Sequence, residues 1–368
     1  MDPATTAVGS AEARTFDALE RGFRRARSRP GIEVRRLSFA LAGRSATLEV
    51  AGDALFDRIT PALAHLAREE PAGQAPGFTA ALWDADATGI REVPPAPGAD
   101  PTVRAEVSVS PDGRWVVQRR SHAVVGHDRA RGAIVGWFRD VERLPLYDRG
   151  RPLHPQILLA NQDRGAPPLH AALVARRGRG ALLVGEGGSG KTTASLACFL
   201  AGFDFLGDDY ISLLRDHRGG YVGHGVYSST HVDPVHLERF PALHARAVFP
   251  SWEGEDKAVV FLSDVAGREA GCGRLERESP IDGLVLPTVR TGPTRVVPAT
   301  PGEAGLRLVQ GAIALAPHAG AGGMAALLEL AASVPAFRLD LGQDIAEIPG
   351  AIAAVLEGIP MQQVSRSP

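Results

Sequence analysis

The strongest chemical signal in the sequence is the glycine-rich octapeptide GEGGSGKT at residues 185–192. An apolar run, ALLV, precedes it and TTASLACFLAG follows, so the octapeptide is expected to join a buried strand to a helix. Glycines let backbone N–H groups approach phosphate oxygens without a Cβ in the way. The pattern predicts a loop that binds nucleotide phosphates through Gly185, Gly187, Gly188, Ser189, Gly190, Lys191, Thr192 and Thr193. The alternative interpretation is a glycine-rich turn that binds nothing.

Lysine is almost absent from this chain, which makes each of its lysines informative. Among 40 basic residues only Lys191 and Lys257 are lysine, and the others are arginine. In this motif the lysine reaches the terminal phosphates and the hydroxyl of Thr192 ligates Mg²⁺. Lys257 opens the apolar run AVVF, where it could stabilise charge on the transferring phosphoryl group or simply be an exposed lysine at the start of a strand.

Two adjacent carboxylates follow the loop closely. Asp208 and Asp209 come 17 and 18 residues after Lys191, behind an expected helix 191–201 and a short strand 203–206. That strand should return both acids to the sheet edge that carries the loop. Because neighbouring side chains of an extended chain point to opposite sides, one acid could hold Mg²⁺ while the other faces the nucleophile. A plain turn at Asp208-Asp209 is the alternative.

This constellation resembles the HPr kinase/phosphorylase family. The family pattern is a histidine that opens a strand, a hairpin into a phosphate loop, a helix and an Asp-Asp pair. It is met here by His170, GEGGSGKT and Asp208-Asp209. The resemblance implies a catalytic domain related in fold to ATP-dependent phosphoenolpyruvate carboxykinase. It also implies that His170 is the active-site histidine, that Asp208 accepts the proton of a serine hydroxyl, and that Asp209 lies near the metal. A structural role for His170 is the alternative.

The chain departs from that family in three places, one of which is that it has no match to the family's glycine-rich segment for the phosphatase reaction. Its first 150 residues do not resemble the N-terminal domain of the HPr enzymes, and Thr193 stands where the family tends to have Glu. The segments RPLHPQILLA, PLHAALVA and RLDLGQDIAEIP resemble a divergent branch of HPr-kinase-like proteins. That branch includes lasso-peptide kinases, which phosphorylate a serine of a precursor peptide.

Periodicity and turn residues predict the elements around these motifs. In the first half we expect a helix over 11–27, a hairpin over 33–50, a helix starting at Asp53 and running to Glu70, a strand at 78–83, a flexible loop over 92–101 and antiparallel strands within 103–138. A segment at 151–168 links this half to the hairpin strands 170–175 and 181–185. Later strands are expected at 203–206, 210–214, 258–262, 283–286, 295–298 and 336–341, and helices near 232–239, 302–315, 322–333 and 344–357.

These expectations define an α/β protein in two domains. Residues 1–150 should form a smaller α+β domain that recognises the substrate. Residues 151–368 should form a phosphate-loop kinase core of HPr kinase/carboxykinase type with a mixed sheet.

Composition excludes several classes of protein. The net charge of −2 does not fit a nucleic-acid binder, and no run of 18 apolar residues indicates a membrane span. The N-terminus lacks the apolar core of a signal peptide, and Cys198 and Cys272 form neither a CxxC motif nor a Cys/His cluster. We expect a cytoplasmic protein with no nucleic-acid or membrane partner, and a homo-oligomer remains an open alternative.

The sequence therefore predicts a kinase that uses ATP and Mg²⁺ to phosphorylate a hydroxyl, most simply a serine of a peptide or small protein. The catalytic residues expected are Asp208, His170, Lys191 and Lys257, and the metal ligands are Thr192 and Asp209. A small-molecule kinase on the same core, and a nucleotide-binding regulator without transfer activity, remain alternatives. The acceptor, and whether ATP or pyrophosphate is the donor, stay open.

Overall fold

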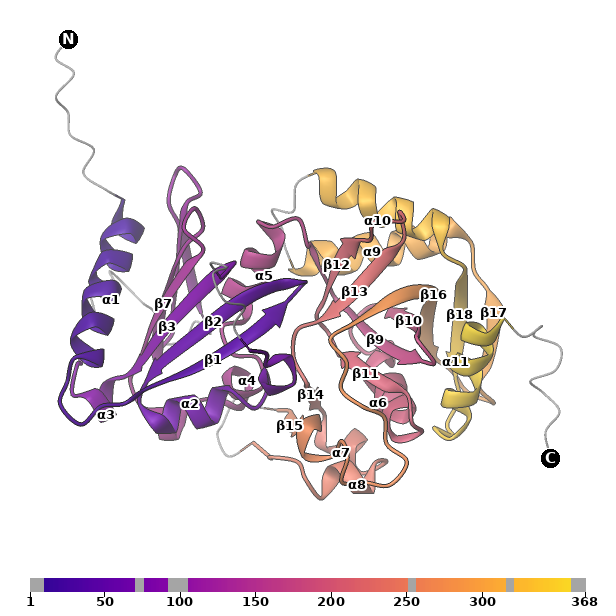
Figure 1. Ribbon diagram of the computed structural model, residues 1–368. Helices are drawn as coiled ribbons and strands as arrows, with labels where there is room; N and C mark the ends of the chain where they lie inside the picture. Colours follow the sequence, from indigo (N-terminus) through magenta and orange to yellow (C-terminus); the bar gives the residue numbers. More distant parts are fainter. Residues whose placement is uncertain (1–9, 70–75, 92–104, 251–255, 316–320, 359–368) are drawn as a thin grey trace, which may run out of the picture. The chain divides into compact units, whose positions relative to one another are not determined.

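The computed structural model describes residues 10–69, 76–91, 105–250, 256–315 and 321–358. The chain is a mixed α/β protein that divides into two compact units (Figure 1). The N-terminal unit comprises the residues up to Ala40, Arg44–Thr60 and Ala67–Ala160. The C-terminal unit comprises Leu41–Gly43, Pro61–Leu66 and the chain from Asn161 onward. Two short segments of the first half therefore belong to the second unit.

The N-terminal unit is built on a mixed sheet in the order β1-β2-β3-β7-β6-β5-β4 within the described residues. Strands β2, β3 and β7 run parallel, whereas β4 to β7 pair antiparallel as the sequence predicted. The strands are β1 Val34–Leu41, β2 Arg44–Ala51, β3 Phe78–Asp84, β4 Glu106–Val109, β5 Trp115–Arg119, β6 Ala123–Asp128 and β7 Ala133–Phe138. The helical elements are α1 Ala11–Arg27, α2 Asp53–Ile59, η1 Ala64–Leu66, α3 Ala85–Thr88, η2 Val141–Arg143, α4 Leu146–Gly150 and α5 His154–Gln162.

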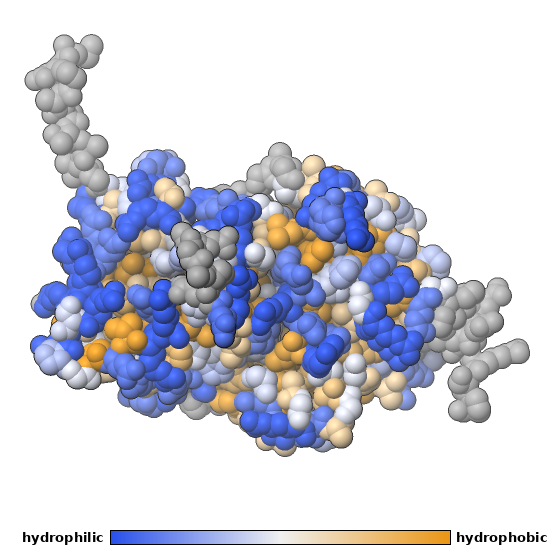
Figure 2. All heavy atoms as spheres, viewed as in Figure 1, coloured by the Kyte–Doolittle hydropathy of each residue, from blue (hydrophilic) through white to orange (hydrophobic). Residues whose placement is uncertain are grey.

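Helix α1 matches its prediction residue for residue because its apolar positions repeat with the helical period. Phe16, Leu19 and Phe23 are buried against the sheet, and the Ser10 side chain accepts a hydrogen bond from the Ala13 amide as an N-cap. The outer side of α1, with Arg21 among its exposed residues, is hydrophilic in Figure 2.

The prediction of a helix over residues 53–70 is wrong in its length. Helix α2 ends at Ile59, and a short 3₁₀ turn, η1, follows. Pro61 is the cause, because the residue before a proline is disfavoured in helical conformation and proline has no amide hydrogen to donate. The N-cap is Gly52, with φ +123°, and Asp53 lies in the first turn. The loop predicted over 92–101 lies outside the described residues.

The C-terminal unit contains the larger mixed sheet. Its described strands follow the order β11-β9-β10-β16-β13-β12-β8, and β18 pairs with β16 and β17. The strands are β8 Pro168–Leu169, β9 Ala171–Arg176, β10 Arg179–Val184, β11 Asp204–Gly207, β12 Ile211–Arg215, β13 Tyr221–Gly225, β14 Ser229–Val232, β15 Ala258–Phe261, β16 Glu278–Val289, β17 Arg295–Pro298 and β18 Ala336–Leu341. The helical elements are α6 Lys191–Leu200, α7 Pro234–Leu237, α8 Pro241–His244, η3 Leu262–Asp264, α9 Pro301–Leu315, α10 Ala321–Ser333 and α11 Glu347–Glu357.

Helices cover both faces of this sheet, and the alternation of side chains in β10 shows how. Leu183 packs in a core with α6 and α11, whereas Leu182 and Val184 pack in a second core with α9 and α10. Strands β13 and β14 were missed by the sequence analysis, and α5 occupies part of the segment expected to be a link. None of the described helices combines the length and the apolar character that a membrane span requires.

Candidate functional site

Four strand ends bring the chemistry-bearing residues to one edge of the larger sheet. Strand β10 runs into the glycine-rich loop, and β9 pairs antiparallel with it so that Ala171 lies opposite Val184. His170 therefore sits beside the start of the loop. Strand β11 is antiparallel to β9, so its carboxyl end delivers Asp208 and Asp209 to the same edge. The parallel strand β16 ends at this edge as well.

The loop has the backbone that its glycines predict. Gly188 and Gly190 have φ of +79° and +99°, a region that L side chains rarely adopt. A Cβ on Gly185 would lie 2.6 Å from the Ser189 Oγ, and one on Gly190 would lie 2.2 Å from the Leu341 Cδ1. The Ser189 hydroxyl is buried and has no hydrogen-bond partner among the described atoms. A tight loop with an unsatisfied polar atom fits a bound polar ligand such as a chain of phosphates.

Lys191 begins α6 and folds back over the loop. Its ammonium group donates hydrogen bonds to the carbonyl oxygens of Gly185 at 2.7 Å and Glu186 at 3.1 Å. Burial lowers the pKa of Lys191, and this effect exceeds the opposing influence of Asp209 and Asp208. A buried cation whose hydrogen bonds go to neutral carbonyls is a favourable place for a phosphate anion, which would supply a compensating negative charge.

Asp208 is held by two threonine hydroxyls. Thr192 Oγ1 donates to Oδ1 of Asp208 at 3.1 Å, and Thr230 Oγ1 donates to Oδ2 at 2.6 Å. Asp208 is 2% exposed and Thr230 is fully buried, so the hydrogen bond between them is shielded from water, whereas Thr192 is half-buried. Thr230 lies on β14, which the sequence analysis missed. No local motif marks Thr230, because its partner lies 22 positions away.

Asp209 faces a different partner from its neighbour. Its Oδ1 lies 3.1 Å from Nε2 of His170, and both side chains are partly exposed. The backbone of Asp209 has φ +74°, which is uncommon outside glycine and is most often adopted by Asn and Asp. This conformation separates the two carboxylates, so Asp208 meets the loop threonine and Asp209 meets the histidine.

The remaining predicted residues lie around this group. Lys257 is exposed, directly precedes β15, and lowers the pKa of Lys191 by its positive charge. Thr193 is half-buried in the first turn of α6.

The oxygen atoms of Thr192 and Asp208 suit a hard cation such as Mg²⁺. In proteins Mg²⁺ is usually held by one or two protein groups together with substrate phosphates. Among the described residues, no group of three or more His, Cys, Asp and Glu side chains is arranged to hold a metal by itself.

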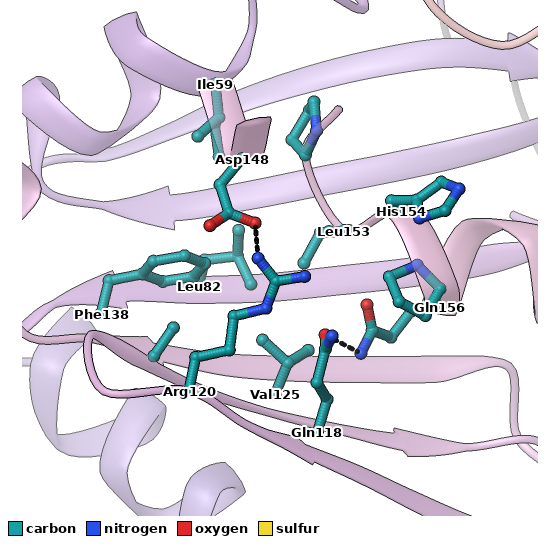
Figure 3. A pocket seen from close by; sticks show the side chains of 13 residues that line it. Ile59, Leu82, Gln118, Arg120, Val125, Phe138, Asp148, Leu153, His154 and Gln156 are labelled. Carbon is teal, nitrogen blue, oxygen red and sulfur yellow. Dashed lines mark hydrogen bonds and ion pairs between the residues drawn. The ribbon is translucent and has the colours of Figure 1, made fainter. Parts of the chain in front are cut away.

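A small cavity in the N-terminal unit contains a separate polar network (Figure 3). Asp148 lies 2.6 Å from Arg120 and 2.8 Å from His122, and the side-chain amides of Gln118 and Gln156 are 3.1 Å apart. The cavity has a volume of about 20 Å³, which is room for a single water molecule. A volume of this size is far too small for a nucleotide, so this cavity is not a nucleotide site.

Comparison with known proteins does not by itself assign this chain to a family or a function. No protein-family model matches the chain, and no curated protein matches it. Among solved structures, the HPr(Ser) kinase/phosphatase from Coxiella burnetii aligns with 52% of this chain and 88% of its own, at 13% identity and a TM-score of 0.29. At that TM-score the similarity assigns neither fold nor function, so a functional assignment depends on the contacts within this chain.

Proposed function

We propose that the protein is an ATP- and Mg²⁺-dependent kinase that transfers the γ-phosphoryl group to a hydroxyl, most simply a serine of a peptide or small protein. The observation that carries the proposal is the meeting of three parts at one sheet edge. These are a glycine-rich loop with Lys191, a carboxylate bonded to the loop threonine, and a second carboxylate beside His170. The core would be of the HPr kinase/carboxykinase type.

In the proposed reaction the acceptor oxygen attacks the γ-phosphorus. A new O–P bond forms, the bond from the γ-phosphorus to the bridging oxygen breaks, and ADP leaves. Lys191 would bind the β- and γ-phosphates from its place on the loop. Thr192 and Asp208 would hold Mg²⁺, whose charge would offset the negative charge of the phosphates. Such a reaction needs positioning and electrostatic stabilisation more than covalent catalysis.

The two carboxylates require separate roles. The resemblance to the HPr kinase/phosphorylase family implies that Asp208 is the base and that Asp209 lies near the metal, whereas the residues alone leave the two roles open. The hydrogen bonds favour the other division, because Asp208 is tied to Thr192, the hydroxyl expected to ligate Mg²⁺, and is almost fully buried. Asp209 is more accessible and adjoins His170, so it is better placed to accept the proton of the attacking hydroxyl and share it with the imidazole.

The Asp208→Asn and Asp209→Asn variants separate these roles. If Asp208 holds the metal, Mg²⁺ should strengthen nucleotide binding less in Asp208→Asn than in the parent, as measured by titration calorimetry. Asp209→Asn should bind Mg-nucleotide normally and lose transfer. The reverse pattern would restore the assignment implied by the resemblance, with the site unchanged.

The acceptor is the least constrained part of the proposal. A carboxylate base beside Mg-ATP suits an alcohol, which has a proton to lose as it attacks. We assign recognition of a peptide, such as a natural-product precursor, to the N-terminal unit, since that unit offers far more surface than a metabolite needs.

The deciding experiment incubates the protein with labelled ATP, Mg²⁺, candidate precursor peptides and the HPr protein, and then locates phosphate by mass spectrometry. The Lys191→Ala variant is the blank. Phosphoserine on a peptide or on HPr would support the proposal. Label only on a small metabolite would favour a small-molecule kinase. Tight ATP binding without any acceptor would favour a nucleotide-binding regulator.

A further inference from the structure

The glycine-rich loop carries an ion pair that binding phosphate does not by itself explain. Glu186, the second residue of the loop, accepts a hydrogen bond at 2.7 Å from Nη1 of Arg307 on α9. A carboxylate on a loop that binds anions repels the phosphates it should attract. Arg307, on another element, places a positive charge beside this carboxylate.

Helix α9 is anchored next to the reacting groups. Its residues Ala304 and Leu308 pack in the core that contains Val184 of β10. One turn after Arg307, Gly311 packs against the backbone at His170. A Cβ added to Gly311 would lie 3.2 Å from the His170 carbonyl oxygen. Residues four apart share one face of a helix, so the face of α9 that bears Arg307 is the face that lies against the candidate site.

The guanidinium of Arg307 can make phosphate contacts that the ammonium groups of the two lysines cannot. A guanidinium presents a planar fork of donors that matches two phosphate oxygens at once, whereas an ammonium group acts as a point charge. Arg307 is 37% exposed and its partner Glu186 is 64% exposed, so the pair is screened by water and easily exchanged. Phosphate oxygens arriving at the loop would compete well for the guanidinium.

We propose that Arg307 binds the terminal phosphate of the nucleotide and that Glu186 holds the guanidinium beside the loop until the nucleotide arrives. The inference rests on the proposed function. During transfer, charge is spread over the equatorial oxygens of the γ-phosphoryl group, and an arginine supplied from the same chain stabilises it there. Arg307 therefore acts as a catalytic residue as well as a binding one.

Nucleotide binding gives the first test. Titration calorimetry with MgATP and MgADP should show that Arg307→Gln weakens MgATP by about tenfold and leaves MgADP nearly unchanged, because only ATP has the terminal phosphate. Arg307→Lys should recover part of the loss. Glu186→Gln should bind both nucleotides a few-fold more tightly. The matched control is Arg215→Gln, which breaks the Arg215–Glu329 pair between β12 and α10, away from the loop, and should change nothing.

Turnover gives the second test. In the transfer assay Arg307→Gln should lose about 10²-fold or more in kcat, the loss typical of removing one preorganised donor to developing charge. If the parent protein binds and uses ATP while Arg307→Gln matches it in both assays, the role of Arg307 is refuted and the kinase stands. If the parent binds no nucleotide, the proposed function fails and this inference fails with it.

Discussion

Removing the Thr230 hydroxyl tests the geometry of the site without reference to activity. Thr230→Val keeps the shape of the side chain and deletes the donor that lies 2.6 Å from Oδ2 of Asp208. Thr230 is fully buried and Asp208 is 2% exposed, so water cannot replace the lost donor. The carboxylate would keep Thr192 as a donor on its other oxygen.

The expected cost depends on the charge of the acceptor. A hydrogen bond to an ionised group contributes about 1.5–3 kcal/mol to stability, against about 1 kcal/mol for a bond between neutral groups. For a unit of roughly 200 residues, a loss of about 2 kcal/mol corresponds to a fall in Tm of about 4–8 °C. Ser195→Ala is the neutral comparison, since the Ser195 hydroxyl is buried and donates to the Thr192 carbonyl at 3.1 Å. It should cost about 1 kcal/mol.

The assay is urea unfolding followed by far-UV circular dichroism, in a double-mutant cycle with Asp208→Asn. In the Asp208→Asn background the cost of Thr230→Val should fall to about 1 kcal/mol, which leaves a coupling energy of at least about 0.5 kcal/mol. Thr230→Ser, which keeps the hydroxyl, should preserve the coupling. An equal cost of Thr230→Val in both backgrounds would show that the hydroxyl does not serve the carboxylate.

Three further variants test other parts of the structure. Lys191→Ala should abolish nucleotide turnover, measured as ADP release, while the variant still unfolds cooperatively; normal turnover would refute the loop assignment. Asp209→Gly should lose transfer, yet its free energy of unfolding should match that of the parent or exceed it by up to about 1 kcal/mol, because glycine adopts φ +74° without strain; a marked loss of stability would contradict this. Burial lowers the pKa of His65 from 6.5 to about 4, so between those pH values only the unfolded chain takes up the proton and the free energy of unfolding should fall as the pH falls. This effect totals about 3 kcal/mol at 1.36 kcal/mol per pH unit. His65→Gln should flatten the pH dependence of unfolding by about that amount, and parallel curves for His65→Gln and the parent would overturn the reasoning.

The sequence alone determined the local structure around the loop. The hairpin of β9 and β10, the glycine-rich turn and helix α6 are specified by residues next to one another in the chain. Their hydrogen bonds are short-range, and the apolar period and the glycines specify them directly. The same is true of α1, whose buried stripe and Ser10 cap are encoded in consecutive residues.

Sequence reasoning failed where a distant part of the chain, or a single proline, outweighed the local pattern. The apolar pattern after Asp53 favours a long helix, but Pro61 ends it, and Pro61–Leu66 then joins the C-terminal unit, where the Ala62 carbonyl accepts from the Ser228 amide. Such an insertion of an early segment into a later unit leaves no local signal in composition or spacing.

Only the tertiary structure decided which side chains meet at the site. Asp208 and Asp209 follow one another directly in the sequence, yet they have different partners. His170 precedes β9, which pairs with β11, whereas Thr230 lies on β14, which pairs with β15. Arg307 lies 121 positions from Glu186, and nothing in its surroundings in the sequence distinguishes it from the many other arginines of the chain. Local spacing encodes bonds between near neighbours, whereas the choice of a distant partner depends on how whole elements pack, because that packing sets which faces and strand ends come together.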